Sequence, residues 1–183
     1  MKALLIVDLQ NDFCPGGALP APDADRIVPV INGLMDKFDL VLASKDWHPA
    51  TTVHFEKWPA HCVRETPGAE FHPGLDAAKI QKVFFKGTDD KDDGYSAFEA
   101  TNGNLADYLR KKEVDEVYVT GLVTEYCVKQ TVLESLRQGF KTFVIEDAVQ
   151  GISAHPNDVP LAKAEMEKAG ALIIKAAKIK TAS

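Results

Sequence analysis

The sequence predicts an α/β protein, a three-layer αβα arrangement built on a six-stranded, mostly parallel sheet. Two observations lead to this fold class. Short apolar runs typical of strands buried on both faces recur along the chain, and segments with helical periodicity stand between them. The chain has 183 residues, enough for one domain with a substantial core and too few for two ordinary ones. We therefore expect a single domain over residues 1–183.

The strands are expected at apolar runs of three or four residues. The first covers residues 4–7. The amino terminus resembles the start of a signal peptide, but its apolar run is too short and meets Asp8 and Asp12 at once. The later strands are expected at residues 40–43, 83–85, 117–119, 142–145 and 172–174.

Helices are expected between these strands. One begins at about Asp23, provided that Pro29 lies early in it or kinks it, and another follows directly from Cys127. Two more are expected around residues 105–112 and 161–169. Residues 45–78 show no periodic pattern, which suggests a functional loop, and their aromatic and histidine content argues against disorder.

Composition excludes several classes of protein. Hydrophobic residues make up 45% and charged residues 26%, as in ordinary globular proteins, and the net charge of -6 argues against a nucleic-acid partner. We find no basic amphipathic stretch and no run of transmembrane length, so no membrane partner is expected. The three cysteines are odd in number and never form a CxxC pair, which fits a reducing, cytoplasmic location. Cys14 and Cys62 lie among turn residues without a nearby cation, and we interpret both as structural.

Chemically useful residues follow the expected strands. They are Asp8, Asp46, Lys86, Cys127 and Asp147. Ligands of such sheets bind beyond the carboxyl ends of the strands, so these side chains are expected to converge. The first turn of a helix favours a thiolate at Cys127, which we expect to be partly ionised near neutral pH. A carboxylate can take the thiol proton and a lysine can stabilise both anions.

Each of these residues also has an ordinary interpretation when taken alone. Cys127 would be a small core residue, Asp8 the cap of a turn and Lys86 a solvated cation. Their coincidence at one edge of the sheet favours a nucleophilic site instead. For Asp147 we retain the ordinary interpretation, in which it caps the segment that follows.

A second group of residues suits a metal ion. Asp46 and His48 are two apart in an extended segment and point to the same side, and His54 and His61 follow. Four of the five histidines lie between positions 48 and 72. Three imidazoles and one carboxylate suit a divalent transition metal, with zinc, iron and manganese all compatible. We interpret His72 as structural, because four ligands are already at hand.

The acidic run at residues 89–94 resembles a calcium-binding loop only weakly. Lys91 occupies a ligand position, and Ala100 stands where the closing glutamate belongs. We therefore expect a solvated acidic loop.

The combined motifs identify a family. They are VDLQNDF at residues 7–13, SKDWH at 44–48, WPAHC at 58–62, FKG at 85–87 and GLVTEYCV at 121–128. The sequence resembles the nicotinamidases, or pyrazinamidase-type enzymes, of the isochorismatase-like cysteine hydrolases, and the resemblance spans nearly the whole chain. One departure is Glu125, where relatives often carry aspartate, and it bears on hydrogen bonding around that turn.

The resemblance implies a role for each candidate residue. It implies a catalytic triad of Asp8, Lys86 and Cys127, and a divalent metal held by Asp46, His48, His54, His61 and waters. It implies an oxyanion hole formed by the backbone N–H groups of Val123 and Cys127, and a non-proline cis peptide between Leu122 and Val123. Phe13 and Trp58 resemble the aromatic pair that sandwiches the pyridine ring, with core packing as the alternative for both. Leu122 and Tyr95 complete the candidate substrate-binding residues.

The activity that the resemblance implies is hydrolysis of nicotinamide to nicotinate and ammonia in NAD salvage, through a thioester on Cys127, with pyrazinamide as a second substrate. The implied partner is this small-molecule substrate, and a homo-oligomer is compatible with it. Three alternatives remain open at this point. They are an amidase for carbamoyl or ureido compounds, a redox or metal-storage protein in which Cys127 oxidises reversibly, and a catalytically silent binding module.

Overall fold

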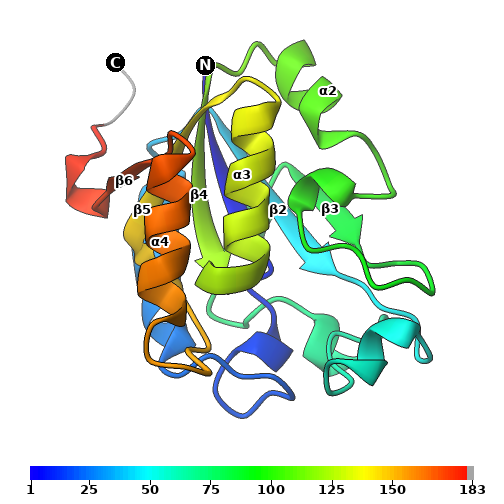
Figure 1. Cartoon of the computed structure of the whole chain (residues 1–183). Helices are drawn as coiled ribbons and strands as arrows, with labels where there is room; N and C mark the ends of the chain where they lie inside the picture. The colour runs from blue at the N-terminus through cyan, green and yellow to red at the C-terminus, as the bar shows by residue number, and fades with distance from the viewer. Residues whose placement is uncertain (181–183) are drawn as a thin grey trace.

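The computed structural model describes residues 1–180 and confirms the α/β fold class (Figure 1). Its sheet has six strands in the order β3-β2-β1-β4-β5-β6, and all five strand pairings are parallel. The strands are β1 (Lys2–Val7), β2 (Leu40–Asp46), β3 (Lys82–Lys86), β4 (Glu116–Leu122), β5 (Lys141–Gln150) and β6 (Leu172–Ile174). Each contains the apolar run from which it was predicted.

Helices cover both faces of the sheet because the strands bury side chains on both. The helices are α1 (Ile27–Met35), α2 (Leu105–Lys111), α3 (Lys129–Arg137) and α4 (Asp158–Lys168). Leu4 and Ile6 of β1 pack in the cluster that includes α1, whereas Leu5 and Val7 pack in the cluster that includes α2, α3 and α4. This alternation is the strand period of two. Figure 1 shows α3 and α4 on the near face of the sheet.

The strand order reverses between β1 and β4. From β1 the chain moves outward through β2 to β3, then crosses to β4 and continues outward to β6. The carboxyl ends of β1 and β4 therefore lie side by side at the point where doubly wound sheets bind their ligands. Among residues 1–180, no helix is both long and apolar enough to cross a membrane.

The fifth strand is longer than the sequence predicted. It continues past residue 145 to Gln150, so Asp147 lies within the strand and not at its end. The pairing with β4 shifts register between Val119 and Gly121, which carries β5 past its two acidic residues. The exposed Asp147 carboxylate accepts a hydrogen bond from the backbone N–H of Ala176 at 2.8 Å, and it takes no part in the site.

The first helix and the long loop follow the prediction with small changes. Asp23 has φ 56° and precedes a 3-10 turn, and α1 then begins at Ile27 with Pro29 in its first turn. Proline is tolerated there because the first N–H groups of a helix have no partner within it. Residues 47–80 contain only short 3-10 turns, at Val53–Glu56, Pro67–Ala69 and Ala77–Lys79.

Candidate active site

Lys86 stands at the centre of the side chains that follow the strands. It ends β3 and is completely buried. Its Nζ lies 2.7 Å from Asp8 Oδ2 and 3.3 Å from the sulfur of Cys127, and it donates to the Gly94 carbonyl at 2.7 Å. It also pairs with Oδ1 of Asp46. Burial alone would lower the pKa of Lys86, but the two carboxylates raise it well above its ordinary value. The cluster therefore holds a permanent cation between two acids and a thiol.

Asp8 is the group best placed to exchange a proton with the thiol. It follows β1 directly in a left-handed conformation, with φ 47°, which aspartate tolerates better than most residues. Its Oδ1 accepts a hydrogen bond from the Ser44 hydroxyl at 2.7 Å. Burial raises the pKa of Asp8 to about 6, although Lys86 acts in the opposite direction. A carboxyl with a pKa near neutrality can both accept and return a proton at physiological pH.

Cys127 lies in a wide turn between β4 and α3. The residues Thr124–Val128 form one π-helical turn instead of the first turn of an α-helix, and the peptide bond between Leu122 and Val123 is cis, as expected. Burial raises the pKa of the Cys127 thiol well above its ordinary value, even though Lys86 lowers it. Burial therefore opposes the partial ionisation that the sequence indicated for this thiol, whereas the Lys86 cation favours it.

The three predicted histidine ligands converge on one point. The side chains of His48, His54 and His61 are buried, and each offers a ring nitrogen within 4.8 Å of the others. Oδ2 of Asp46 lies 3.5 Å from Nε2 of His48 and 3.7 Å from Nε2 of His61. The same carboxylate touches Lys86 through its other oxygen, so it joins the histidine cluster to the thiol cluster.

Hydrogen bonds at Nδ1 prepare these imidazoles to bind a cation. Nδ1 of His48 lies 2.9 Å from the Gly87 carbonyl, and Nδ1 of His61 lies 2.7 Å from the Pro59 carbonyl. A carbonyl only accepts, so each Nδ1 carries the proton and Nε2 keeps its lone pair. Nε2 of His48 is buried and has no hydrogen-bond partner among the described residues. A buried acceptor without a donor fits a metal ion at this point.

Two glycines let the chain fold tightly around the site. A Cβ on Gly87, with φ 63°, would lie 2.5 Å from the His48 ring, and a Cβ on Gly94, with φ 77°, would lie 2.3 Å from the nitrogen of Gly87. The loop between them therefore returns close enough for the Gly94 carbonyl to reach Lys86. Side chains at either position would push this loop away from the cation.

A cavity of about 340 Å³ adjoins both clusters. It is lined by Phe13, Leu19, Asp46, His54, Trp58, His61, Gly94, Tyr95, Val123, Tyr126, Cys127 and Ile152. The rings of Phe13 and His61 lie 5.4 Å apart, and Trp58 donates its indole N–H to the Tyr95 hydroxyl at 3.1 Å. Aromatic and apolar side chains make up much of this lining, which suits a flat ring.

The cavity wall differs from the sequence prediction at several places. Leu122 is fully buried in the core and does not line the cavity, whose wall begins at Val123. Leu19, Tyr126 and Ile152 line it without having been predicted. Tyr126 could have been inferred from its place beside the thiol, whereas isolated apolar residues in loops carry no such signal.

Two polar residues after β1 support the site and were also missed. Gln10 is completely buried and binds the backbone of Asp46 twice, accepting from its N–H and donating to its carbonyl, both at 2.8 Å. Oδ2 of Asp12 accepts the N–H of Cys62, next to His61, at 2.7 Å. The sequence shows that polar residues follow the first buried strand directly. It does not show which loops they bind, because those contacts form only in the folded protein.

Glu125 supports the part of the cavity wall that contains Tyr126 and Ile152. Its buried carboxylate accepts a hydrogen bond from the N–H of Ser153 at 2.8 Å. This bond ties the turn that carries Cys127 to the segment that carries Ile152. The glutamate at this position therefore forms a hydrogen bond with a distant loop, at Ser153.

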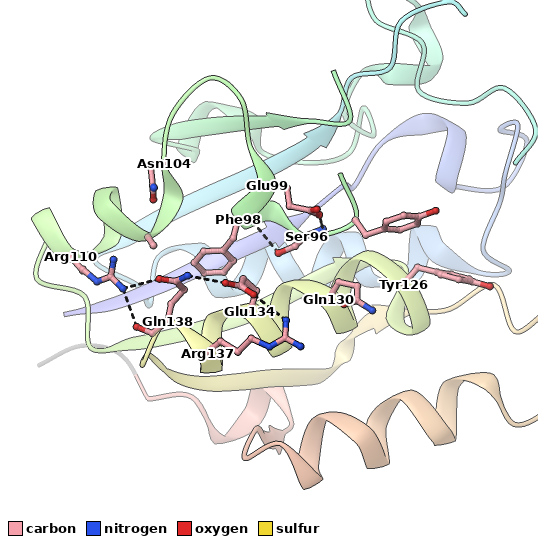
Figure 2. Close-up of a pocket in the computed structure, with 12 residues that line it drawn as sticks. Ser96, Phe98, Glu99, Asn104, Arg110, Tyr126, Gln130, Glu134, Arg137 and Gln138 are labelled. Carbon is pink, nitrogen blue, oxygen red and sulfur yellow. Dashed lines mark hydrogen bonds and ion pairs between the residues drawn. The ribbon is translucent and has the colours of Figure 1, made fainter. Parts of the chain in front are cut away.

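A larger hollow of about 1270 Å³ lies elsewhere, between residues 95–104, α2 and α3 (Figure 2). Its two arginines are already paired: Arg110 binds Gln138 at 2.8 Å, and Arg137 binds Glu134 at 3.2 Å. It shares only Tyr95 and Tyr126 with the smaller cavity. We therefore assign the chemistry to the smaller cavity, which contains the thiol.

The site contains a thiol, a proton-accepting carboxyl and a buried cation at the switch point of a parallel sheet. This arrangement is typical of cysteine hydrolases. Comparison with known families gives the particular family. The isochorismatase domain matches residues 2–178, and the chain belongs to the isochorismatase family.

The relatives include enzymes with established names. The chain is 43% identical to the nicotinamidase of Escherichia coli, over 94% of this chain and 93% of the relative. Among solved structures, an Acinetobacter baumannii nicotinamidase/pyrazinamidase is 37% identical, with a TM-score of 0.91 and 98% of both chains covered. A Pyrococcus horikoshii pyrazinamidase in complex with zinc is 42% identical, with a TM-score of 0.86, over 95% of this chain and 98% of that one.

Proposed function

We propose that this chain is a metal-containing amidohydrolase that converts nicotinamide to nicotinate and ammonia in NAD salvage, and that it also hydrolyses pyrazinamide. The observation that carries the proposal is the buried cation of Lys86, in contact with Asp8, Asp46 and Cys127 beside a cavity with aromatic walls. The similarity to nicotinamidases supports the choice of substrate.

The reaction begins with proton transfer inside the cluster. Asp8 takes the proton of the Cys127 thiol while Lys86 stabilises the thiolate. The sulfur then attacks the carboxamide carbon. Backbone N–H groups of Val123 and Cys127 stabilise the oxyanion, an effect of about 3–4 kcal/mol for one good donor. The C–N bond breaks as Asp8 returns the proton to the leaving ammonia.

A thioester on Cys127 remains, and a water molecule hydrolyses it. Asp8, again ionised, accepts a proton from the attacking water. The C–S bond then breaks, and Asp8 returns this proton to the sulfur, which restores the Cys127 thiol. The product leaves as nicotinate, and its acid proton passes to ammonia or to solvent.

A divalent ion would be held by Asp46, His48, His54 and His61. We propose zinc, which the ligand set suits and which the Pyrococcus horikoshii relative contains. When bound, the ion supplies a Lewis acid for the pyridine nitrogen of the substrate. Phe13 and Trp58 lie in the cavity wall, where they can hold the ring between aromatic faces.

All of the proposed catalytic and metal-binding residues belong to one chain, which is compatible with a homo-oligomer. The three cysteines are free, which is consistent with the cytoplasmic location that we propose.

Purified protein is expected to release ammonia from nicotinamide, and removal of the metal with a chelator is expected to raise KM. A charge-assisted contact to the ring nitrogen contributes about 1.5–3 kcal/mol, on the order of 10- to 100-fold in KM. Added zinc should restore the original value. Steady-state ammonia release before and after chelation measures both effects. Hydrolysis of carbamoyl amines in place of nicotinamide would overturn the proposal.

Replacement of Trp58 by alanine is expected to raise KM for nicotinamide roughly 5- to 30-fold, because a ring-stacking partner contributes about 1–2 kcal/mol. The chain offers a matched control in its one other tryptophan. Trp47 packs against Phe85, 5.1 Å between ring centroids, and does not line the cavity. Trp47→Ala should leave KM unchanged. Equal KM values for the two variants would contradict the assignment of Trp58 to the substrate.

A further inference from the structure

The acidic loop after β3 meets the candidate metal site through one side chain, that of Asp92. Its Oδ1 lies 3.1 Å from Nδ1 of His54 and accepts a hydrogen bond from the Tyr95 hydroxyl at 2.8 Å. Its Oδ2 pairs with Nζ of Lys57. The Tyr95 hydroxyl in turn accepts the indole N–H of Trp58 at 3.1 Å. One carboxylate thus connects a candidate metal ligand with two side chains of the cavity wall.

His54 differs from the other two imidazoles in the kind of partner at Nδ1. His48 and His61 face main-chain carbonyls, whereas His54 faces a carboxylate. A carboxylate at this position fixes the tautomer, orients the ring and makes the other nitrogen a stronger ligand. The loop is therefore not simply solvated, as the sequence had indicated, because the Asp92 side chain is only 26% exposed and its Oδ1 contacts both His54 and Tyr95.

We propose that Asp92 is a positioning residue that prepares His54 for metal binding and, through Tyr95 and Trp58, couples occupation of the metal site to the shape of the substrate cavity. This inference rests on the proposed function, since a divalent ion at the histidine cluster is part of that proposal. The coupling is reciprocal: a metal that fixes His54 also orders Asp92 and the aromatic wall, and an ordered wall favours the metal.

The first test measures zinc affinity of the full chain by competition with a chromogenic chelator. Asp92→Ala is expected to weaken zinc binding about 10- to 100-fold. Asp89→Ala is the matched control, because it removes the same charge from the same loop and Asp89 pairs only with the exposed Lys91 among the described residues. Its affinity should stay within about twofold of the original. Thermal unfolding of the metal-free variants verifies that all three proteins are folded.

Two further readouts separate positioning from a general loss of structure. Tyr95→Phe removes the hydroxyl that joins Asp92 to Trp58 but leaves Asp92 against His54. It should therefore raise KM for nicotinamide and, because the coupling is reciprocal, weaken zinc binding, but by less than Asp92→Ala does. In the metal-free protein, nitrogen NMR of the imidazoles should show His54 protonated at Nδ1, and Asp92→Ala should convert it to a mixture of tautomers.

The outcomes distinguish this inference from the function on which it rests. If the original chain binds zinc and Asp92→Ala has the same zinc affinity, the role of Asp92 is overturned and the metal site is not. The same holds if Asp89→Ala loses as much zinc affinity as Asp92→Ala. An original chain that binds no zinc overturns the metal site and the role of Asp92 together. A 10- to 100-fold loss in Asp92→Ala that Asp89→Ala does not share, with the tautomer change at His54, supports the inference.

Discussion

Replacement of Cys127 by alanine is expected to abolish nicotinamide hydrolysis, with kcat lower by a factor on the order of 10⁴ to 10⁶. The sulfur makes the bond that replaces the amide, so no neighbouring group can substitute for it. Cys14→Ala is the matched control, because Cys14 is also a buried free thiol but does not line the cavity. It should retain kcat within about a factor of two to three.

Intact-mass analysis identifies the nucleophile independently of turnover. Nicotinaldehyde carries an electrophilic carbon in the position of the amide and should add one molecule to the original chain and to Cys14→Ala. It should add none to Cys127→Ala. Measurable turnover in Cys127→Ala, or an adduct on it, would assign the nucleophile to another residue.

Replacement of Lys86 by methionine is expected to remove activity and to lower the free energy of unfolding by about 3–5 kcal/mol. Methionine has a similar length but no charge, so Asp8 and Asp46 would face each other in the protein interior without a cation. Urea unfolding at neutral pH measures the loss. Adding Asp8→Asn to Lys86→Met should recover part of it, because one of the two uncompensated charges is then gone.

Lys45 provides the control for this experiment. It lies on the neighbouring strand and pairs with Glu70 at 2.7 Å, but the Glu70 side chain is 55% exposed. Lys45→Met should therefore cost about 1 kcal/mol or less, since water can solvate the carboxylate that remains. If Lys86→Met were as stable as Lys45→Met, the buried cation would not stabilise the fold.

Much of the fold and of the candidate site could be predicted because parallel sheets impose simple rules. Apolar runs such as residues 117–119 mark strands buried on both faces, and residues that follow strands, such as Asp8, meet at one edge. The strand predicted at residues 142–145 is too short, because Glu146 and Asp147 interrupt the apolar pattern. In the structure the strand continues past them to Gln150.

What could not be predicted depends on contacts between distant loops. Asp92 reaches His54 across 38 positions in the sequence, and no periodic pattern encodes such a contact. The burial of Cys127 could not be predicted for the same reason. A helix terminus favours the thiolate, but the loops that close over the thiol remove it from water, and this loss of solvation is larger. Burial is a property of the assembled fold.

The histidine cluster beside the thiol has a consequence for specificity, because a metal ion there would select pyridine carboxamides whose ring nitrogen is free. The walls of the adjoining cavity come from separate segments that close to about 340 Å³, with His54 and His61 on one side. In a dinucleotide coenzyme the same carboxamide is present, but the ring nitrogen is bonded to ribose and has no lone pair for an ion. The intact dinucleotide coenzyme should therefore escape hydrolysis, and only free nicotinamide released from it should be hydrolysed.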